Sequence, residues 1–360
     1  MCRLQTKRMR MQLKKFLSIV LICTVHASCS QTDANQSSYV DELYTDFSGK
    51  ILEWSELIDT KLCDWLEDPY DDTPDSAAPN DALSNEIKKM DSFFQNQKFF
   101  DESEKTYLRL RLESDFHSKE PNDFNAKLNA QLPLSRSKKH LKIFIDDLTD
   151  KNAKDLFHEN LDKKEPSSGI GIHYFAPQAY GITSRYSLGM TGITPFVRAK
   201  YNIPFKIDGW MIDPIQLFQY STENELIEQT NIYFDKKLEN SAFFRLLLHR
   251  KTESEINGMD YALALQYFQS PKKDKGFSVS QSFEGNTEYL DISQNNPDPK
   301  QANTYSGINN YTTSFRWRES IWRKWFFYEM GPAVNFHKKF DYKPNYSLNF
   351  MIDFYFGNYR

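Results

Sequence analysis

The sequence lacks any long apolar run. No stretch of about 20 apolar residues occurs among its 360 residues, and the mean hydropathy is -0.67. This excludes a membrane protein built from several spanning helices, because each such helix needs about 20 mostly apolar residues. A β-barrel is not excluded, since its strands alternate apolar and polar residues and so average to a polar hydropathy. The net charge of -4 gives no reason to expect a nucleic-acid partner.

Cysteines and the common chemical motifs are also scarce. The chain has 4 cysteines, of which Cys2 and Cys23 lie within the first 28 residues, the segment interpreted below as a signal peptide. The other two, Cys29 and Cys63, make no disulfide framework. There is no P-loop, no dinucleotide fingerprint, no His-Glu-x-x-His and no cysteine cluster, so the usual nucleotide and zinc sites lack support. We therefore expect no cofactor and no metal, and we favour a protein that is not an enzyme.

The N-terminus has the order of a secretory signal peptide. Basic residues precede the apolar run Phe16–Val25, and small residues follow it. This run is short for a membrane anchor, so we expect a cleaved signal over residues 1–28. Val25-His-Ala27 suits an ordinary signal peptidase. Ala27-Ser-Cys29 instead resembles the end of a lipobox and makes Cys29 a candidate for lipidation, although His26 stands where such a box normally has an aliphatic residue.

A helical periplasmic segment is expected next, over residues 39–100, after a polar tether at 29–38. From Tyr39 to Leu66 the apolar residues recur every three or four positions, which places them on one helical face. An acidic, Pro-rich linker covers 67–82, and a second short helix is expected from Leu83 to Phe94. The apolar face predicts that this segment plugs the barrel lumen, contacts a periplasmic partner through the 39–66 helix, or packs on itself.

After about Lys105 the apolar period changes from 3.6 to 2. Leu108, Leu110 and Leu112 alternate with charged residues, and similar alternation continues to the aromatic closing segment Tyr346–Phe356. We expect about 12 to 14 strands, each near the length that crosses a membrane at a tilt. The predicted fold class is all-β, a transmembrane antiparallel β-barrel over residues 101–360. A secreted β-sandwich would also alternate, but it does not explain such long strands with one charged face.

The residues opposite the apolar row are expected to line the lumen. They are Arg109, Arg111, Lys127, Lys142, Arg198, Lys200, Arg245, Arg316 and Arg318, with the acids Glu113, Asp146, Asp213, Asp235, Glu329 and Asp353. Two interpretations stay open. The charges pair and fill a water-containing lumen, or the excess of cations forms a constriction that prefers anions. His173 and His249 share the inward parity and are candidate bases for a barrel enzyme, although no motif places a nucleophile beside either.

These features together resemble the poorly characterised outer-membrane β-barrel proteins of Gram-negative bacteria. The resemblance implies an outer-membrane location, contact with outer-membrane lipid, and recognition of the last strand by the barrel-assembly machinery. Phe356 is followed by four more residues, which departs from the usual aromatic terminus. We expect the last strand to pair with the strand near Tyr107 and so to close the wall.

Three functions are compatible with such a barrel. The first is a passive channel or transport-associated barrel with a charged, Arg/Lys-rich lumen. The second is a lipid-modifying enzyme of the phospholipase or lipid A hydrolase type, which would use His173 or His249. The third is a structural or adhesive barrel that presents the segments 148–167 and 286–303 at the cell surface.

Overall fold

The computed structural model describes residues 34–66, 82–94, 98, 105–134, 141–147, 168–223, 225–239, 241–254, 256–272, 274–291 and 303–358. The predicted signal peptide, Cys29, nearly all of the predicted acidic linker and the segment 148–167 lie outside the described residues. The same holds for residues 292–302, the middle of the second predicted surface segment.

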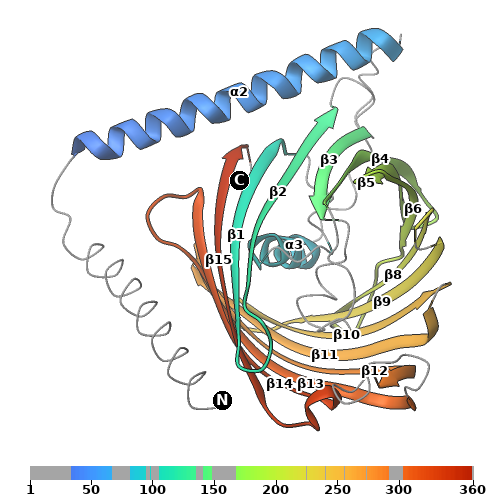
Figure 1. Cartoon of the computed structure of the whole chain (residues 1–360). Coiled ribbons are helices and arrows are strands. Elements are labelled where there is room, and N and C mark those ends of the chain that lie inside the picture. The colour runs from blue at the N-terminus through green and yellow to red at the C-terminus, as the bar shows by residue number, and fades with distance from the viewer. Residues whose placement is uncertain are drawn as a thin grey trace. The chain divides into compact units, whose positions relative to one another are not determined.

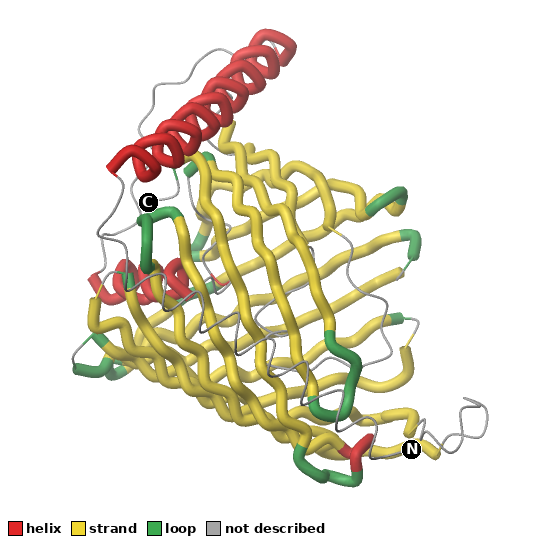
Figure 2. Tube along the Cα trace, turned by 60° about the vertical axis from the view of Figure 1, so that its left-hand side comes forward, coloured by secondary structure: helices red, strands yellow, loops and turns green. Residues whose placement is uncertain are grey.

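A closed antiparallel β-barrel dominates the structure (Figures 1 and 2). Each strand pairs with the next along the chain, except that β6 pairs with β8 and not with the short β7. β1 pairs with β15, so that 14 of the 15 described strands form a ring. The predicted fold class is confirmed. The strands are β1 (Tyr107–His117), β2 (Asp123–Leu134), β3 (Leu141–Asp147), β4 (Ser168–Ala179), β5 (Ile182–Thr191), β6 (Thr194–Asn202), β7 (Phe205–Ile207), β8 (Trp210–Ser221), β9 (Glu225–Lys237), β10 (Ala242–Glu253), β11 (Ile256–Lys272), β12 (Lys275–Asp291), β13 (Asn303–Ser320), β14 (Phe326–His337) and β15 (Asn345–Gly357).

The barrel closes where the first strand meets the last. β1 and β15 lie side by side in Figure 1, with Tyr107 opposite Gly357 and Arg111 opposite Asp353. Closure gives the backbone N–H and C=O groups of both strands a partner, which an open sheet edge would leave to the solvent or lipid. The predicted pairing of the closing strand with the strand near Tyr107 is therefore confirmed.

The two faces of the wall differ in polarity. Along β10 the side chains of Phe243, Arg245, Leu247 and His249 are buried inside the ring, and those between them point the other way. The outward row is apolar in several strands, and Leu188 there is 63% exposed. Successive side chains of a strand point to opposite faces, so one alternating sequence produces both a polar interior and an apolar exterior.

In the described part of the chain, two helices precede the barrel. The 33-residue helix α2 (Ala34–Leu66) begins before the predicted start at Tyr39, and its apolar residues Tyr39 and Trp54 are well exposed. α3 (Ala82–Phe94) matches the second predicted helix and lies inside the barrel (Figure 1). Neither of these two described helices combines the length and the apolar character that a membrane span requires.

Candidate functional site

Helix α3 is tied to the lumen wall by a buried arginine. Arg245 on β10 is 1% exposed, and its Nη1 and Nη2 each donate to a carboxylate oxygen of Asp91 at 2.8 Å. Its Nε and Nη2 also donate to Asp235 on β9, at 2.6 and 2.9 Å. One guanidinium therefore bridges the helix and the wall with two bidentate contacts, the strongest geometry available to an arginine–carboxylate pair.

A lysine just after the helix completes this arrangement. Lys98 Nζ donates to Asp235 at 2.8 Å and forms an ion pair with Asp213 on β8. We call Asp91, Lys98, Asp213, Asp235 and Arg245 the docking cluster, and all five are buried. Buried charges require such partners, because an isolated charge pays a large desolvation cost.

Aromatic contacts add to the charged ones. The ring centroid of Phe94 lies 5.3 Å from that of Phe268 on β11, which in turn stacks on Phe243 of β10 at 4.5 Å. Ile87, one turn before Asp91, packs on Met211 of β8. The docked face of α3 therefore combines a carboxylate with a row of apolar side chains, at the barrel end where β8, β10, β12 and β14 begin.

The C-terminal end of α3 meets a second arginine. Arg316 Nη2 on β13 donates to the backbone oxygen of Phe94 at 3.1 Å, while its Nε donates to Glu329 at 2.8 Å. The last carbonyls of a helix carry partial negative charge and lack intrahelical partners, so a cation there is favourable. This contact holds the helix end against β13.

A second charge cluster lies at the barrel seam. Asp353 on β15 accepts hydrogen bonds from Arg111 Nε at 2.8 Å and Nη2 at 3.1 Å, and from Arg318 Nη1 at 2.8 Å. Arg318 also contacts Glu329 at 3.3 Å, and Lys127 pairs with Glu113 at 3.0 Å. In this part of the lumen the charges are paired, as the first of the two open interpretations requires.

The wall formed by β3 to β6 carries mainly cations. Lys142, His173, Ser187 and Arg198 lie opposite one another in successive strand registers. Arg185 and Lys200 face each other in an adjacent row. Among the described inward positions of β4, β5 and β6 there is no Asp or Glu. Positive charge is therefore concentrated on one side of the described lumen.

The predicted lumen residues divide by burial. Buried are Arg109, Arg111, Lys142, Arg245, Arg318, Asp213, Asp235, Glu329 and Asp353, together with His173 and His249; half-buried are Lys127, Arg198, Lys200, Arg316 and Glu113. Asp146 lies opposite Gly169 in the ladder, and its side chain is outside the described part.

Among the charged residues of the lumen that escaped the sequence analysis are Asp91, Lys98 and Arg185. Asp91 and Lys98 lie before the strands, in a segment where period-2 alternation gives no information. The position of Asp91 one turn after Ile87 on the apolar helix face was the available signal. Arg185 is buried and alternates with Ser184 and Tyr186, so the strand pattern could have identified it.

The two histidines predicted as candidate bases, His173 and His249, have different neighbours. His173 Nδ1 lies 2.7 Å from Ser187 Oγ, and its ring stacks on Phe144 at 3.9 Å. His249 Nδ1 lies 2.6 Å from Asn231 Oδ1. Pairing of β4 with β5 brings Ser187 to His173, which no local motif could show. Within the described ranges no group of three His, Cys, Asp or Glu side chains could hold a metal ion.

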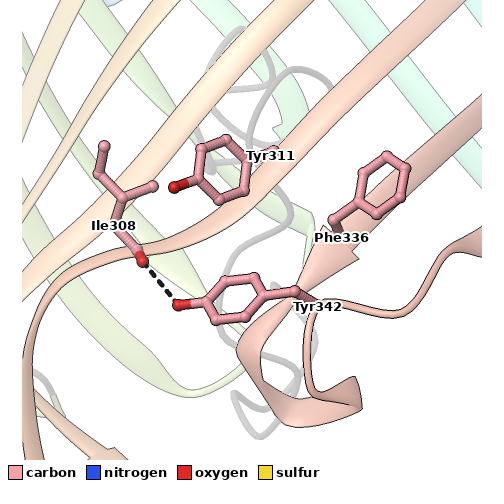
Figure 3. A pocket seen from close by; sticks show the side chains of 4 residues that line it. All are labelled: Ile308, Tyr311, Phe336 and Tyr342. Carbon is pink, nitrogen blue, oxygen red and sulfur yellow. Dashed lines mark hydrogen bonds between the residues drawn. The ribbon is translucent and has the colours of Figure 1, made fainter.

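A small aromatic pocket lies beside β13 and β14. Its volume is about 610 Å³, and Ile308, Tyr311, Phe336 and Tyr342 line it (Figure 3). Tyr342 Oη donates to the backbone oxygen of Ile308 at 2.9 Å, and the rings of Tyr311 and Tyr342 are 6.0 Å apart. Tyrosines with one apolar and one polar end are common where a membrane meets water.

Comparison with known proteins finds weakly similar solved structures but no relative in sequence. No family model matches the chain, and no curated protein matches it in sequence. A solved structure of OmpT from Vibrio cholerae, with loop L8 deleted, has 6% identity and a TM-score of 0.41, covering 70% of this chain and 98% of its own. OccK5 (OpdH) of Pseudomonas aeruginosa has 9% identity and a TM-score of 0.41, with 70% and 97% covered. The KdgM porin in complex with disordered oligogalacturonate has 6% identity and a TM-score of 0.33, with 68% and 98% covered. At these values nothing about activity follows.

Proposed function

We propose that the chain is an outer-membrane β-barrel that acts as a channel, or a transport-associated barrel, whose lumen is plugged by α3. The outward apolar side chains of the strands support the membrane location, because a soluble barrel would expose them to water. Outer-membrane lipid is then the partner of the outer face, and the barrel-assembly machinery its partner during insertion. The exposed apolar face of α2 suits a periplasmic partner.

The location has a simple test. A closed membrane barrel should run faster on a denaturing gel before heating than after heating, and it should leave the membrane fraction only with detergent. A monomer that stays soluble without detergent would contradict the membrane location.

The docking of α3 is the observation that carries the channel proposal. A barrel that only anchors loops or binds lipid has no need to bring a helix into its interior and to hold it with a docking cluster. Charged and polar side chains line the rest of the described lumen, as they do in water-filled barrels. Non-covalent contacts hold the helix against the wall, and we expect its removal to open a path for solutes through the lumen.

Planar-bilayer conductance tests this proposal. We would compare the mature protein with a variant in which residues 82–94 are replaced by a Gly/Ser linker of equal length and Lys98 is kept. The mature protein should conduct rarely, and the linker variant should show stable open channels. A linker variant that folds, as judged by its heat-dependent gel shift, yet does not conduct would overturn the channel proposal.

The pair of Ser187 and His173 supports a second candidate, a lipid-modifying barrel enzyme. A histidine nitrogen within hydrogen-bond reach of a serine hydroxyl is the arrangement that activates a serine nucleophile. Hydrolysis of phospholipid or lipid A that disappears in both Ser187→Ala and His173→Ala would support it. His249→Ala is the matched control, because His249 has Asn231 instead of a serine beside Nδ1. A folded barrel that neither conducts nor hydrolyses lipid would leave the structural or adhesive function.

A further inference from the structure

The guanidinium of Arg245 is held in place by the barrel itself. Asp235 accepts two of its hydrogen bonds from the wall, and the Arg245 Cζ atom lies 5.0, 5.2 and 5.7 Å from the ring centroids of Tyr233, Phe243 and Phe268. None of these groups belongs to α3. The Nη1–Nη2 edge that binds Asp91 would therefore keep its orientation when the helix leaves, which is the condition for a preorganised anion site.

An aromatic surface of the wall, formed by Phe243 and Phe268, adjoins this edge. The ring of Phe94, three residues after Asp91, contacts the stacked pair Phe243 and Phe268. Gly276 makes room for it, since a Cβ atom there would lie 3.0 Å from Phe94 Cζ. Asp91 and Phe94 lie on one helix face, so α3 presents a carboxylate and a benzene ring together to two adjacent subsites of the wall.

We propose that these two subsites form a receptor for a small aromatic monocarboxylate, and that Asp91 and Phe94 occupy it as an internal mimic of that solute. The carboxylate of the solute would take the Nη1–Nη2 edge of Arg245, and its ring would stack on Phe268. Solute and helix then compete, so that binding of the solute releases the plug. This inference rests on the proposed role of α3 as a plug.

The charges around the two subsites favour a solute with one negative charge over a solute with two. Lys98, Asp213, Asp235 and Arg245 carry two positive and two negative charges, and docked Asp91 adds one negative charge. A monocarboxylate in place of Asp91 would reproduce the net charge of the docked state. A dianion would add a second negative charge close to Asp213 and Asp235, which like-charge repulsion opposes in a poorly hydrated site.

Isothermal calorimetry with 3-phenylpropionate tests the receptor. The double variant Asp91→Asn/Phe94→Ala removes the charge and the ring with which α3 competes for the two subsites, so it should bind the acid at least about tenfold more tightly than the mature protein. Propionate, which lacks the ring, and 3-phenylpropanamide, which lacks the charge, should each bind at least about tenfold more weakly to the double variant. Equal affinity for the acid and the amide would overturn the receptor.

A further pair of substitutions locates the binding. Arg245→Gln with Asp235→Asn removes one positive and one negative charge together, which avoids an unpaired buried carboxylate. Added to the double variant, this pair should abolish binding of 3-phenylpropionate; if affinity persists, the receptor is not at Arg245. Arg250→Gln is the control, because Arg250 lies on the same strand and is partly exposed.

Release of the plug has its own readout. Lys88 and Lys89 are exposed on α3, and trypsin cleaves a helix only where it opens. In the mature protein, saturating 3-phenylpropionate should speed cleavage after these lysines at least about fivefold, and 3-phenylpropanamide should not.

The receptor and the channel can fail separately. If the double variant binds 3-phenylpropionate but the linker variant does not conduct, the channel proposal is wrong and the receptor proposal holds. If the linker variant conducts but the double variant does not bind 3-phenylpropionate, only the receptor proposal is wrong.

Discussion

Asp353 joins strands from both sides of the barrel seam. It accepts hydrogen bonds from Arg111 on β1 and Arg318 on β13, while its own strand, β15, pairs with β1. Such a group contributes little over an apolar residue of the same shape, because desolvation cancels much of the Coulomb gain. Its removal is costly for another reason, since two buried arginines would lose the carboxylate that they share.

We predict that Asp353→Asn destabilises the barrel by about 3 kcal/mol, the usual cost of breaking a buried ion pair on one side. Urea unfolding in detergent or lipid, followed by the heat-dependent gel shift, measures the change. Lys343→Ala is the control: Lys343 pairs with Asp341 at 3.2 Å, but its side chain is 69% exposed, so the change should stay within about 0.5 kcal/mol. Equal effects of the two substitutions would argue against a structural role for the seam cluster.

At the scale of elements, α3 behaves as a ligand of the wall. The residues on its docked side are Ile87, Asp91 and Phe94, at spacings of four and three, which places them on one helix face. This short helix therefore presents all three side chains to β8, β10 and β11. A helix of this length is marginally stable alone in water. Its order therefore depends on the contacts with the barrel, and weakening them should open it.

We predict that Gly276→Ala weakens the docking of α3. A Cβ atom at this position would lie 2.8 Å from Phe93 Cε1 and 3.0 Å from Phe94 Cζ, and 2.9 Å from the backbone oxygen of Gln269. Trypsin cleavage after Lys88 and Lys89 should accelerate. Gly331→Ala is the matched control, since the nearest atoms to its Cβ are 3.7 Å away. Cleavage at the same rate in both variants would show that the docking of Phe93 and Phe94 does not depend on the space beside Gly276.

At the scale of the whole barrel, the lumen is electrically uneven. Acids and cations lie together near the seam and around α3, while the described inward positions of β4 to β6 include two arginines and a lysine and no Asp or Glu. A ring or wall of side chains with charge of one sign lowers the energy of ions of the opposite charge in a pore. An opened lumen should then prefer anions.

We predict an anion-selective reversal potential for the linker variant in a KCl gradient. Adding Arg185→Gln and Arg198→Gln should move that potential toward zero, because two of the cations would be removed from this wall. Lys206→Gln is the control, since Lys206 is exposed on β7, outside the ring. A cation-selective pore, or one that does not respond to the two arginine changes, would contradict the prediction.

The sequence by itself determined the wall. Alternation with period two needs only neighbouring residues, so the strands from Tyr107 onward, the apolar exterior and the pairing of the last strand with the first could be predicted. The 3.6 period likewise indicated α3. A polar interior and an apolar exterior follow from the pleat alone, whatever the rest of the chain does.

Only the tertiary structure decided what the wall encloses. Asp91 and Arg245 are far apart in the chain, and Ser187 reaches His173 only through the pairing of β4 with β5. Such contacts depend on strand register and on where a helix enters the ring, and neither leaves a local pattern. The alternation of its neighbours predicted that Arg245 points into the lumen. Its carboxylate partner on α3, Asp91, could not be predicted, because long-range contacts are set by closure of the whole barrel.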